Sequence, residues 1–208
     1  MSDVWLVVGL GNPGPTYARN RHNLGFMAVD ALAERSGASF AWRAQGRALA
    51  AAVRIGWAAG GAPGPPAVLA KPQLFMNRSG GPVAELIGYS GVDLDRLVVV
   101  HDDLDLPAWD VRLKRGGGEG GHNGLRDISQ ALGAKDYIRV RLGIGRPPPG
   151  SDAAAYVLRD FPVSQRPDAA LLAQKGADAV ERVILDGLDS AQLAFHTRPI
   201  PPDGGDLR

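Results

Sequence analysis

The residues that decide the fold read WLVVGLGNPG and occupy positions 5–14. Residues 5–9 are mostly apolar and rich in side chains that favour a buried strand. The letters GNPG that follow form a turn, because glycine and proline interrupt regular structure. Apolar side chains then recur at helical spacing over residues 24–32, and Ser36-Gly37 ends that segment. A strand, a turn and a helix in this order predict the first unit of an α/β fold.

The same alternation continues along the chain. Strands are predicted at residues 47–57, 67–71, 97–101, 109–114 and 138–145, and helices at residues 80–89, 125–132 and 169–185. No internal repeat or linker separates these segments. We therefore predict a single α/β domain over residues 1–196, with a twisted, mixed and largely parallel sheet sandwiched between helices. Residues 197–208 are rich in proline and glycine, which predicts a disordered tail.

The composition limits the chemistry that the chain can perform. Of 208 residues, 45% are hydrophobic and 22% are charged, as in ordinary globular domains. There is no cysteine, which excludes disulfides and thiolate metal ligands. The apolar run at residues 4–10 is too short to cross a bilayer and has no basic flank, so we predict a cytoplasmic protein without membrane contact. The net charge of +1 argues against a generally basic nucleic-acid binder, but basic residues cluster locally at positions 112–115 and 139–146.

The opening stretch also fits the pattern G-x-G-x-x-G at residues 9–14, which raises the possibility of dinucleotide binding. That function requires a helix to begin within the motif, so that its N-terminal amides meet the pyrophosphate. Pro13 and Pro15 remove two amide donors and disfavour helix just before them. Helical periodicity begins only around Asn23, and Asp30, at the spacing of a ribose-binding acid, lies inside the first helix. We therefore predict no nucleotide cofactor.

Four short motifs follow one another along the chain. They are GLGNPG with Tyr17, RHN at residues 21–23 and Gly25-Phe26; FMN at residues 75–77 with Ser79-Gly80; HDDLDLP at residues 101–107; and GGGEGGHNG at residues 116–124. In type and order these motifs resemble the signatures of bacterial peptidyl-tRNA hydrolases, and the resemblance extends from Val4 to Phe161. It implies a monomeric enzyme, without cofactor or metal, that hydrolyses the ester between a peptide and the ribose at the 3′ CCA end of tRNA.

By this resemblance His22 is the general base. Imidazole titrates near neutral pH and can accept a proton from the attacking water. Asp102 corresponds to the acidic partner, because a carboxylate bonded to one ring nitrogen fixes the tautomer and stabilises the imidazolium. Neighbouring side chains on a strand point to opposite faces. Only one of His101 and Asp102 is therefore expected to face the pocket, and the resemblance selects Asp102.

The resemblance also assigns neutral side chains to the substrate. Asn77 and Asn123 are expected to hold the peptide, the attacking water or the oxyanion through amide donors and acceptors. Asn12 is placed with the catalytic residues, because an uncharged amide beside the ester can separate peptidyl-tRNA from aminoacyl-tRNA, whose free ammonium it does not compensate. Tyr17 and Phe75 match positions around the terminal nucleotide, where an aromatic ring can stack on a base.

Two basic residues match positions that the family uses on the tRNA 5′ phosphate at the acceptor stem. They are Lys114 and Arg141, and such contacts position RNA without reading its sequence. The glycine-rich residues 116–121 lack the Lys-Ser or Lys-Thr of a nucleotide-binding loop, and we predict a mobile rim that orders on binding. Glu119 stands where a neutral residue or histidine is common in the family, which weakens the transfer of an RNA contact to this loop.

Two other functions are compatible with parts of the sequence. His101, Asp102, Asp103 and Asp105 contain ligand types for a metal-dependent hydrolase, but strand alternation opposes a shared centre. An inactive RNA-binding relative would keep the basic residues and lose the base or its partner, whereas this chain retains both. We therefore predict hydrolysis with no metal.

Overall fold

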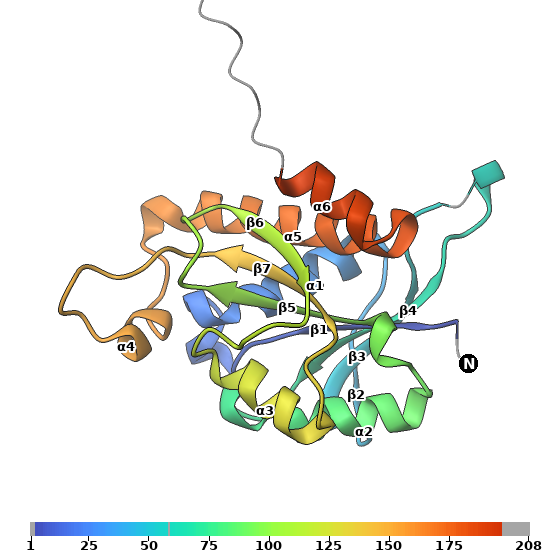
Figure 1. Ribbon diagram of the computed structural model, residues 1–208, viewed down its shortest axis with the longest axis horizontal. Coiled ribbons are helices and arrows are strands. Elements are labelled where there is room, and N and C mark those ends of the chain that lie inside the picture. The colour runs from blue at the N-terminus through green and yellow to red at the C-terminus, as the bar shows by residue number, and fades with distance from the viewer. Residues whose placement is uncertain (1–2, 58, 197–208) are drawn as a thin grey trace, which may run out of the picture.

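The computed structural model describes residues 3–57 and 59–196. Its centre is a seven-stranded sheet with the order β2-β3-β4-β1-β5-β7-β6 (Figure 1). The strands are β1 (Trp5–Gly9), β2 (Ala41–Arg43), β3 (Ala48–Arg54), β4 (Pro66–Pro72), β5 (Leu97–Asp103), β6 (Val111–Arg115) and β7 (Ile138–Gly143). The four central strands β4, β1, β5 and β7 run parallel. β3 joins them antiparallel, with β2 antiparallel to β3, and β6 pairs antiparallel with β7 at the other edge.

Helices cover both faces of the sheet (Figure 1). The α-helices are α1 (Leu24–Arg35), α2 (Gly80–Ser90), α3 (Asn123–Leu132), α4 (Ala153–Val157), α5 (Arg166–Asp186) and α6 (Leu188–His196). Single 3₁₀ turns are η1 (Pro15–Tyr17), η2 (Arg21–Asn23), η3 (Ala59–Gly61), η4 (Met76–Arg78), η5 (Leu94–Arg96) and η6 (Val163–Gln165). α1, α5 and α6 pack on one face, and α2 and α3 pack on the other. The predicted α/β architecture, with a mixed sheet between helical layers, is confirmed.

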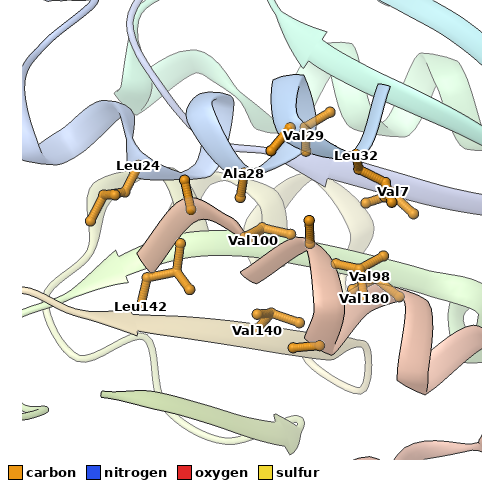
Figure 2. Close-up of a cluster of buried hydrophobic side chains, with 14 of the residues drawn as sticks. Val7, Leu24, Ala28, Val29, Leu32, Val98, Val100, Val140, Leu142 and Val180 are labelled. Carbon is orange, nitrogen blue, oxygen red and sulfur yellow. The ribbon is translucent and has the colours of Figure 1, made fainter. Parts of the chain in front are cut away.

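The larger core lies between the sheet and the layer formed by α1 and α5. Figure 2 shows Val98 and Val100 of β5 in one cluster with Ala28 of α1 and Val180 of α5, all at most 1% exposed. The residues of β5 that alternate with these two valines, Leu97 and Val99, face the second core under α2 and α3. Continuing this alternation puts Asp102 on the face of α1 and His101 on the face of α3.

Three elements differ from the sequence prediction. β2 forms the edge of the sheet with three exposed residues, and α4 and α6 are additional short helices. The predicted domain boundary at 196 coincides with the end of the described residues, and the predicted tail at 197–208 lies outside them. Among the described residues, no helix combines the length and apolar character needed to cross a membrane.

Candidate active site

Two glycines bring the start of α1 onto the end of β1. A Cβ atom on Gly9 would lie 2.3 Å from the carbonyl oxygen of Gly25, and one on Gly25 would lie 2.4 Å from the backbone nitrogen of Leu10. Only glycine permits this approach. The Phe26 amide donates to the Leu10 carbonyl at 3.2 Å and holds the helix there. The glycines of the first motif thus serve helix–strand packing, and the segment that carries His22 is held beside the strand ends.

A cavity of about 530 Å³ opens at the carboxyl ends of β1 and β5. Parallel sheets commonly bind ligands at this edge. Seven of the predicted site residues line the cavity: Asn12, Tyr17, His22, Phe75, Asn77, Asp102 and Asn123. Its remaining wall consists of Met76, Asp103, Leu104, Glu119, Gly120, Gly121, His122, Ala153, Ala154, Val157 and Leu158. The site therefore has a polar centre and an apolar wall contributed largely by α4.

His22 and Asp102 are in direct contact. The Nδ1 atom of His22 lies 2.8 Å from Oδ1 of Asp102, and both residues are buried. Since an ionised carboxylate only accepts hydrogen bonds, Nδ1 carries the proton and Nε2 keeps its lone pair. This is the tautomer that a general base requires.

The electrostatics of the pair favour charge on both groups. Burial lowers the pKa of His22, but the Asp102 carboxylate outweighs it and holds the pKa above its usual value. For Asp102, burial raises the pKa, and the neighbouring His22 and His122 together bring it well below its usual value. Asp102 is therefore ionised at neutral pH, where it can stabilise an imidazolium on His22.

His122 is a site residue that was not singled out from the sequence. Its Nε2 atom lies 3.2 Å from the same Asp102 oxygen, and its ring lies 4.8 Å from that of His22. Its Nδ1 accepts from the Leu125 amide at the start of α3. With Nδ1 as acceptor, Nε2 bears the proton and donates to Asp102. One carboxylate oxygen thus orients two imidazoles.

Asn12 is held in one orientation by three hydrogen bonds. Its backbone amide donates to Oδ1 of Asn23 at 2.9 Å, and Nδ2 of Asn23 donates to the Asn12 carbonyl at 2.9 Å. Its side-chain oxygen accepts from the Met76 amide at 2.8 Å. Because the oxygen is occupied, the amide NH₂ of Asn12 is the group left to meet a ligand in the cavity. Asn12 is 5% exposed, so its side chain has little room to rearrange.

The other predicted substrate-binding residues lie at the rim. Tyr17 and Phe75 meet edge-to-face with ring centroids 6.1 Å apart, and Phe75 is more than half exposed. Asn77 is exposed on η4, and Asn123 is exposed at the first turn of α3, where its Oδ1 accepts from Arg126. Two aromatic surfaces and two exposed side-chain amides therefore border the polar centre.

Comparison with known proteins places the chain in a family. The family described as Peptidyl-tRNA hydrolase matches residues 6–203. A peptidyl-tRNA hydrolase of Kineococcus radiotolerans is 58% identical over 94% of this chain and 98% of its own length, and one of Frankia casuarinae is 56% identical over 92% and 93%. The chain belongs to the peptidyl-tRNA hydrolase family.

Solved structures agree with this assignment. A crystal structure of peptidyl-tRNA hydrolase from Acinetobacter baumannii has a TM-score of 0.82 at 32% identity, over 94% of this chain and 95% of the other. A second, described as a complex of peptidyl-tRNA hydrolase with N-propanol, has a TM-score of 0.84 at 30% identity, over 96% and 98%. The prediction of an enzyme of the peptidyl-tRNA hydrolase family is confirmed.

Two predicted residues of this hydrolase lie outside the cavity, on the strands β6 and β7. Nε of Arg141 donates to Asp103 at 2.8 Å, and Nζ of Lys114 lies 3.5 Å from the Gly118 carbonyl. Partial burial and the guanidinium groups of Arg141 and Arg139 lower the pKa of Lys114. The two cations form a patch beside the cavity, so a ligand could contact both regions.

The side chain of Arg139 binds the backbone of the glycine-rich loop of the hydrolase. It is fully buried, and its Nη1 and Nη2 donate to the carbonyls of Gly118 and Gly117 at 2.7 and 2.9 Å. An ion pair of 3.0 Å between Glu119 and Lys135 holds the outer part of the loop. In this structure the rim at residues 116–121 is tied on both sides.

The carboxylates of the third motif do not converge on a metal centre. Asp103 pairs with Arg141 and Asp105 pairs with Arg146, while His101 donates Nδ1–H to the Asp102 carbonyl at 2.7 Å. A different set, His22, Asp102 and His122, has ligand-type atoms within 4.8 Å of one another. A metal on Nε2 of His122 would leave the proton on Nδ1, facing the Leu125 N–H donor. The hydrogen bonding of His122 therefore favours a proton, not a metal, between the rings and Asp102.

Proposed function

We propose that this chain hydrolyses the ester that joins the peptide to the 3′-terminal ribose of peptidyl-tRNA, with His22 as general base. The observation that carries the proposal is the 2.8 Å contact between His22 Nδ1 and Asp102, inside a cavity of a chain of this family. It leaves the basic nitrogen Nε2 available in a site large enough for an ester and its two substituents.

In the proposed reaction Nε2 of His22 takes a proton from a water molecule as the water oxygen attacks the ester carbonyl. The carbonyl electrons move to oxygen, and the amide NH₂ of Asn12 is positioned to donate to this oxyanion or to the neighbouring peptide carbonyl. When the intermediate collapses, the ester C–O bond breaks, and the ribose oxygen takes the proton back from His22. The products are a peptide carboxylic acid, which ionises in water, and tRNA with a free hydroxyl.

The remaining residues are proposed to hold the two ends of the substrate. Tyr17 and Phe75 offer stacking faces for the terminal base, and Asn77 and Asn123 offer amides to the peptide or the water. Lys114 and Arg141 would contact phosphate of the acceptor stem. We propose that the protein acts as a monomer in the cytoplasm, where its substrate arises.

The test is hydrolysis of an N-acetylated aminoacyl-tRNA by the purified protein after exhaustive chelation of metals. We expect full activity, and we expect His22→Ala to lower turnover on the order of a hundred- to ten-thousandfold while binding of deacylated tRNA stays unchanged. Wild-type binding without hydrolysis would instead identify an RNA-binding relative. Activity that returns only with added metal would restore the metal-dependent alternative.

A further inference from the structure

The segment just before the catalytic His22 is fastened to the chain just after α4. Arg21 is 7% exposed, and its Nη1 donates to the carbonyls of Arg159 and Asp160 at 3.2 and 3.1 Å. The Arg21 backbone amide donates to Arg159, and the Phe161 amide donates back to the Arg19 carbonyl. Asn20 adds a side-chain bond of 2.7 Å to the Asp160 carboxylate.

Two aromatic rings complete the surroundings of this arginine. The guanidinium carbon lies 4.4 Å from the centroid of the Tyr156 ring and 5.1 Å from that of Phe161. A guanidinium can stack on rings and donate at its edge at the same time, which an ammonium cannot do. Tyr156 is itself held, because its hydroxyl donates to the Ile144 carbonyl at 3.0 Å. Arg21, Tyr156 and Phe161 are called the clamp below.

The clamp determines where α4 stands. Between the end of β7 and α4 the chain forms turns and irregular structure through the sequence RPPPGSD at residues 146–152, much of it exposed. Tyr156 lies in α4, so the clamp holds this helix directly. The clamp residue that contacts Tyr156 is Arg21, which immediately precedes His22.

The face of α4 toward the cavity is apolar. It contributes Ala153, Ala154 and Val157, and Leu158 follows the helix. The polar groups of the cavity, around His22 and Asn12, lie on the ends of β1 and β5 and on the loops beside them. In an ester under attack, the carbon that bears the side chain is bonded to the carbonyl carbon. That side chain therefore cannot lie far from the water activated by His22, and α4 is the apolar surface that the clamp places beside this centre.

We propose that the apolar face of α4 is the subsite for the side chain of the esterified amino acid, and that Arg21 is a positioning residue that sets the distance between this subsite and His22. The proposal rests on the proposed function, since it names which part of the peptidyl-tRNA meets α4. Ala153 and Ala154 are small and leave room for large apolar side chains, so substrates with such side chains gain most from the subsite.

The test compares N-acetyl-leucyl-tRNA with N-acetyl-glycyl-tRNA, the second of which has no side chain to place. Arg21→Lys keeps the charge but loses the stacked geometry, and we expect kcat/KM to fall more for the leucyl than for the glycyl substrate. Arg19→Lys is the matched control, because Arg19 is exposed in the same segment and joins the contact with Phe161 through its backbone carbonyl. It should leave the ratio of the two substrates unchanged.

A second variant tests the subsite without touching the clamp. Ala154 is exposed, so Ala154→Leu should fold normally, fill the subsite and lower the leucyl-to-glycyl ratio about tenfold. An unchanged ratio in both Arg21→Lys and Ala154→Leu would overturn the proposal. If Arg21→Lys does not fold, Ala154→Leu decides alone.

Hydrogen exchange separates this proposal from the proposed function. The Tyr156 amide of α4 donates to the carbonyl of Asp152, the residue just before the helix, and it should exchange faster in Arg21→Lys than in the wild type. If the wild type cleaves neither substrate, the proposed function fails. Unchanged protection of the Tyr156 amide would show that Arg21 does not position α4.

Discussion

At the scale of single residues, the site depends on one oxygen atom of Asp102 that accepts from both His22 and His122. The pKa of the carboxyl is held low by these two neighbours against the effect of burial. A carboxyl whose pKa is lowered on folding stabilises the protein above its unfolded pKa of about 3.9, and this contribution disappears as the pH falls through the lowered value. At neutral pH the carboxylate is thus available both for stability and for the proposed orientation of His22.

Asp102→Asn should separate these roles. The amide can present its NH₂ to Nδ1 of His22, which moves the ring proton to Nε2 and disables the base. We expect turnover to fall on the order of a hundred- to ten-thousandfold. The pKa of His22, which Asp102 raises, should drop because burial then acts alone. The acidic limb of the pH–rate profile should therefore move to lower pH, and a limb that stays in place would argue against the pair.

The hydrogen bonding of Asn12 bears on how the site could distinguish a blocked from an unblocked aminoacyl-tRNA. Its oxygen is bound to the Met76 amide, so its NH₂ donors face the cavity. A blocked substrate offers a carbonyl acceptor there, whereas the free ammonium of an aminoacyl-tRNA offers only more donors. Asn12 is therefore predicted to favour the blocked substrate through donor–acceptor matching as well as through its lack of charge.

Asn12→Asp should weaken this preference. One carboxylate oxygen can keep the bond from Met76, and the other would replace the donor with a negative charge. Hydrogen bonds to charged groups contribute about 1.5–3 kcal/mol, so the ratio of kcat/KM for unblocked over blocked aminoacyl-tRNA should rise by about tenfold or more. Asn12→Ser, which adds no charge, is the control. An equal ratio in the wild type and Asn12→Asp would mean that another residue discriminates.

Residues of the site could be predicted where they carry a motif, but their contacts could not. Asn12 follows β1, His22 precedes α1 and Asp102 lies near the carboxyl end of β5, and their positions at one edge of the sheet follow from the alternation of elements. His122 could not be predicted as a site residue, because the direction of its side chain depends on the path of the loop that precedes it. Gly120 and Gly121 there have φ of +58° and +79°, and no periodicity in the sequence reports the path of such a backbone.

At the scale of elements, α6 closes an edge of the sheet. The Leu113 amide of β6 donates to Nε2 of His196 at 2.9 Å, and the Leu113 carbonyl accepts from Gln192 at 3.0 Å. The outward backbone groups of an edge strand otherwise invite pairing with another chain. Two side chains of α6 thus bond the backbone N–H and C=O of Leu113, the central residue of β6.

This closure should depend on pH. Partial burial and the positive charges of Arg112 and Arg141 lower the pKa of His196. A histidine whose pKa is lowered on folding contributes stability above its unfolded pKa of about 6.5, and the contribution is lost as the pH falls below that value. Protonated His196 also cannot accept from Leu113. The Leu113 amide should therefore exchange faster at pH 5.5 than at pH 8, after correction for intrinsic exchange.

His196→Gln is the matched variant, since its side-chain oxygen can accept without titrating. Protection of Leu113 in this variant should depend less on pH than in the wild type. The comparison also removes the contribution of His101, whose pKa burial lowers in both proteins. Equal pH dependence in the wild type and His196→Gln would show that His196 does not control the edge.

The elements that sequence patterns did not predict share a physical reason. β2 is three residues long and exposed on both faces, so it has no alternation of apolar and polar side chains. In α6 only Ala191 is buried, and α4 has five residues after a proline-rich stretch. Periodicity reports burial on one face, and these elements are held by hydrogen bonds and single side chains instead.

At the scale of the whole molecule, a nearly neutral chain carries a concentrated basic face. On β6 and β7 the apolar residues Leu113, Val140 and Leu142 belong to the core under α5. By alternation, Lys114, Arg139 and Arg141 extend from the opposite face. The net charge of +1 therefore conceals a local field beside the cavity, which is the scale at which a polyanion would be attracted.

Lys114 and Arg141 of this face should set the salt dependence of substrate use. Arg139 is fully buried and occupied by backbone carbonyls, so phosphate contact falls to the half-buried Lys114 and Arg141. Arg141 already pairs with Asp103, whereas the contact between Lys114 and Gly118 is long. Neutralising either should raise KM more than it lowers kcat and should reduce the slope of log KM against log salt by about one unit.

Lys114→Gln should weaken substrate binding more than neutralisation of Arg141 does, because the Lys114 ammonium has the weaker partner within the protein and is freer to bind phosphate. Lys175→Gln, exposed on α5 across the sheet, should leave the slope unchanged. If the Lys114 and Arg141 double variant keeps the wild-type slope, both cations are only solvated strand residues, and RNA approaches from another side.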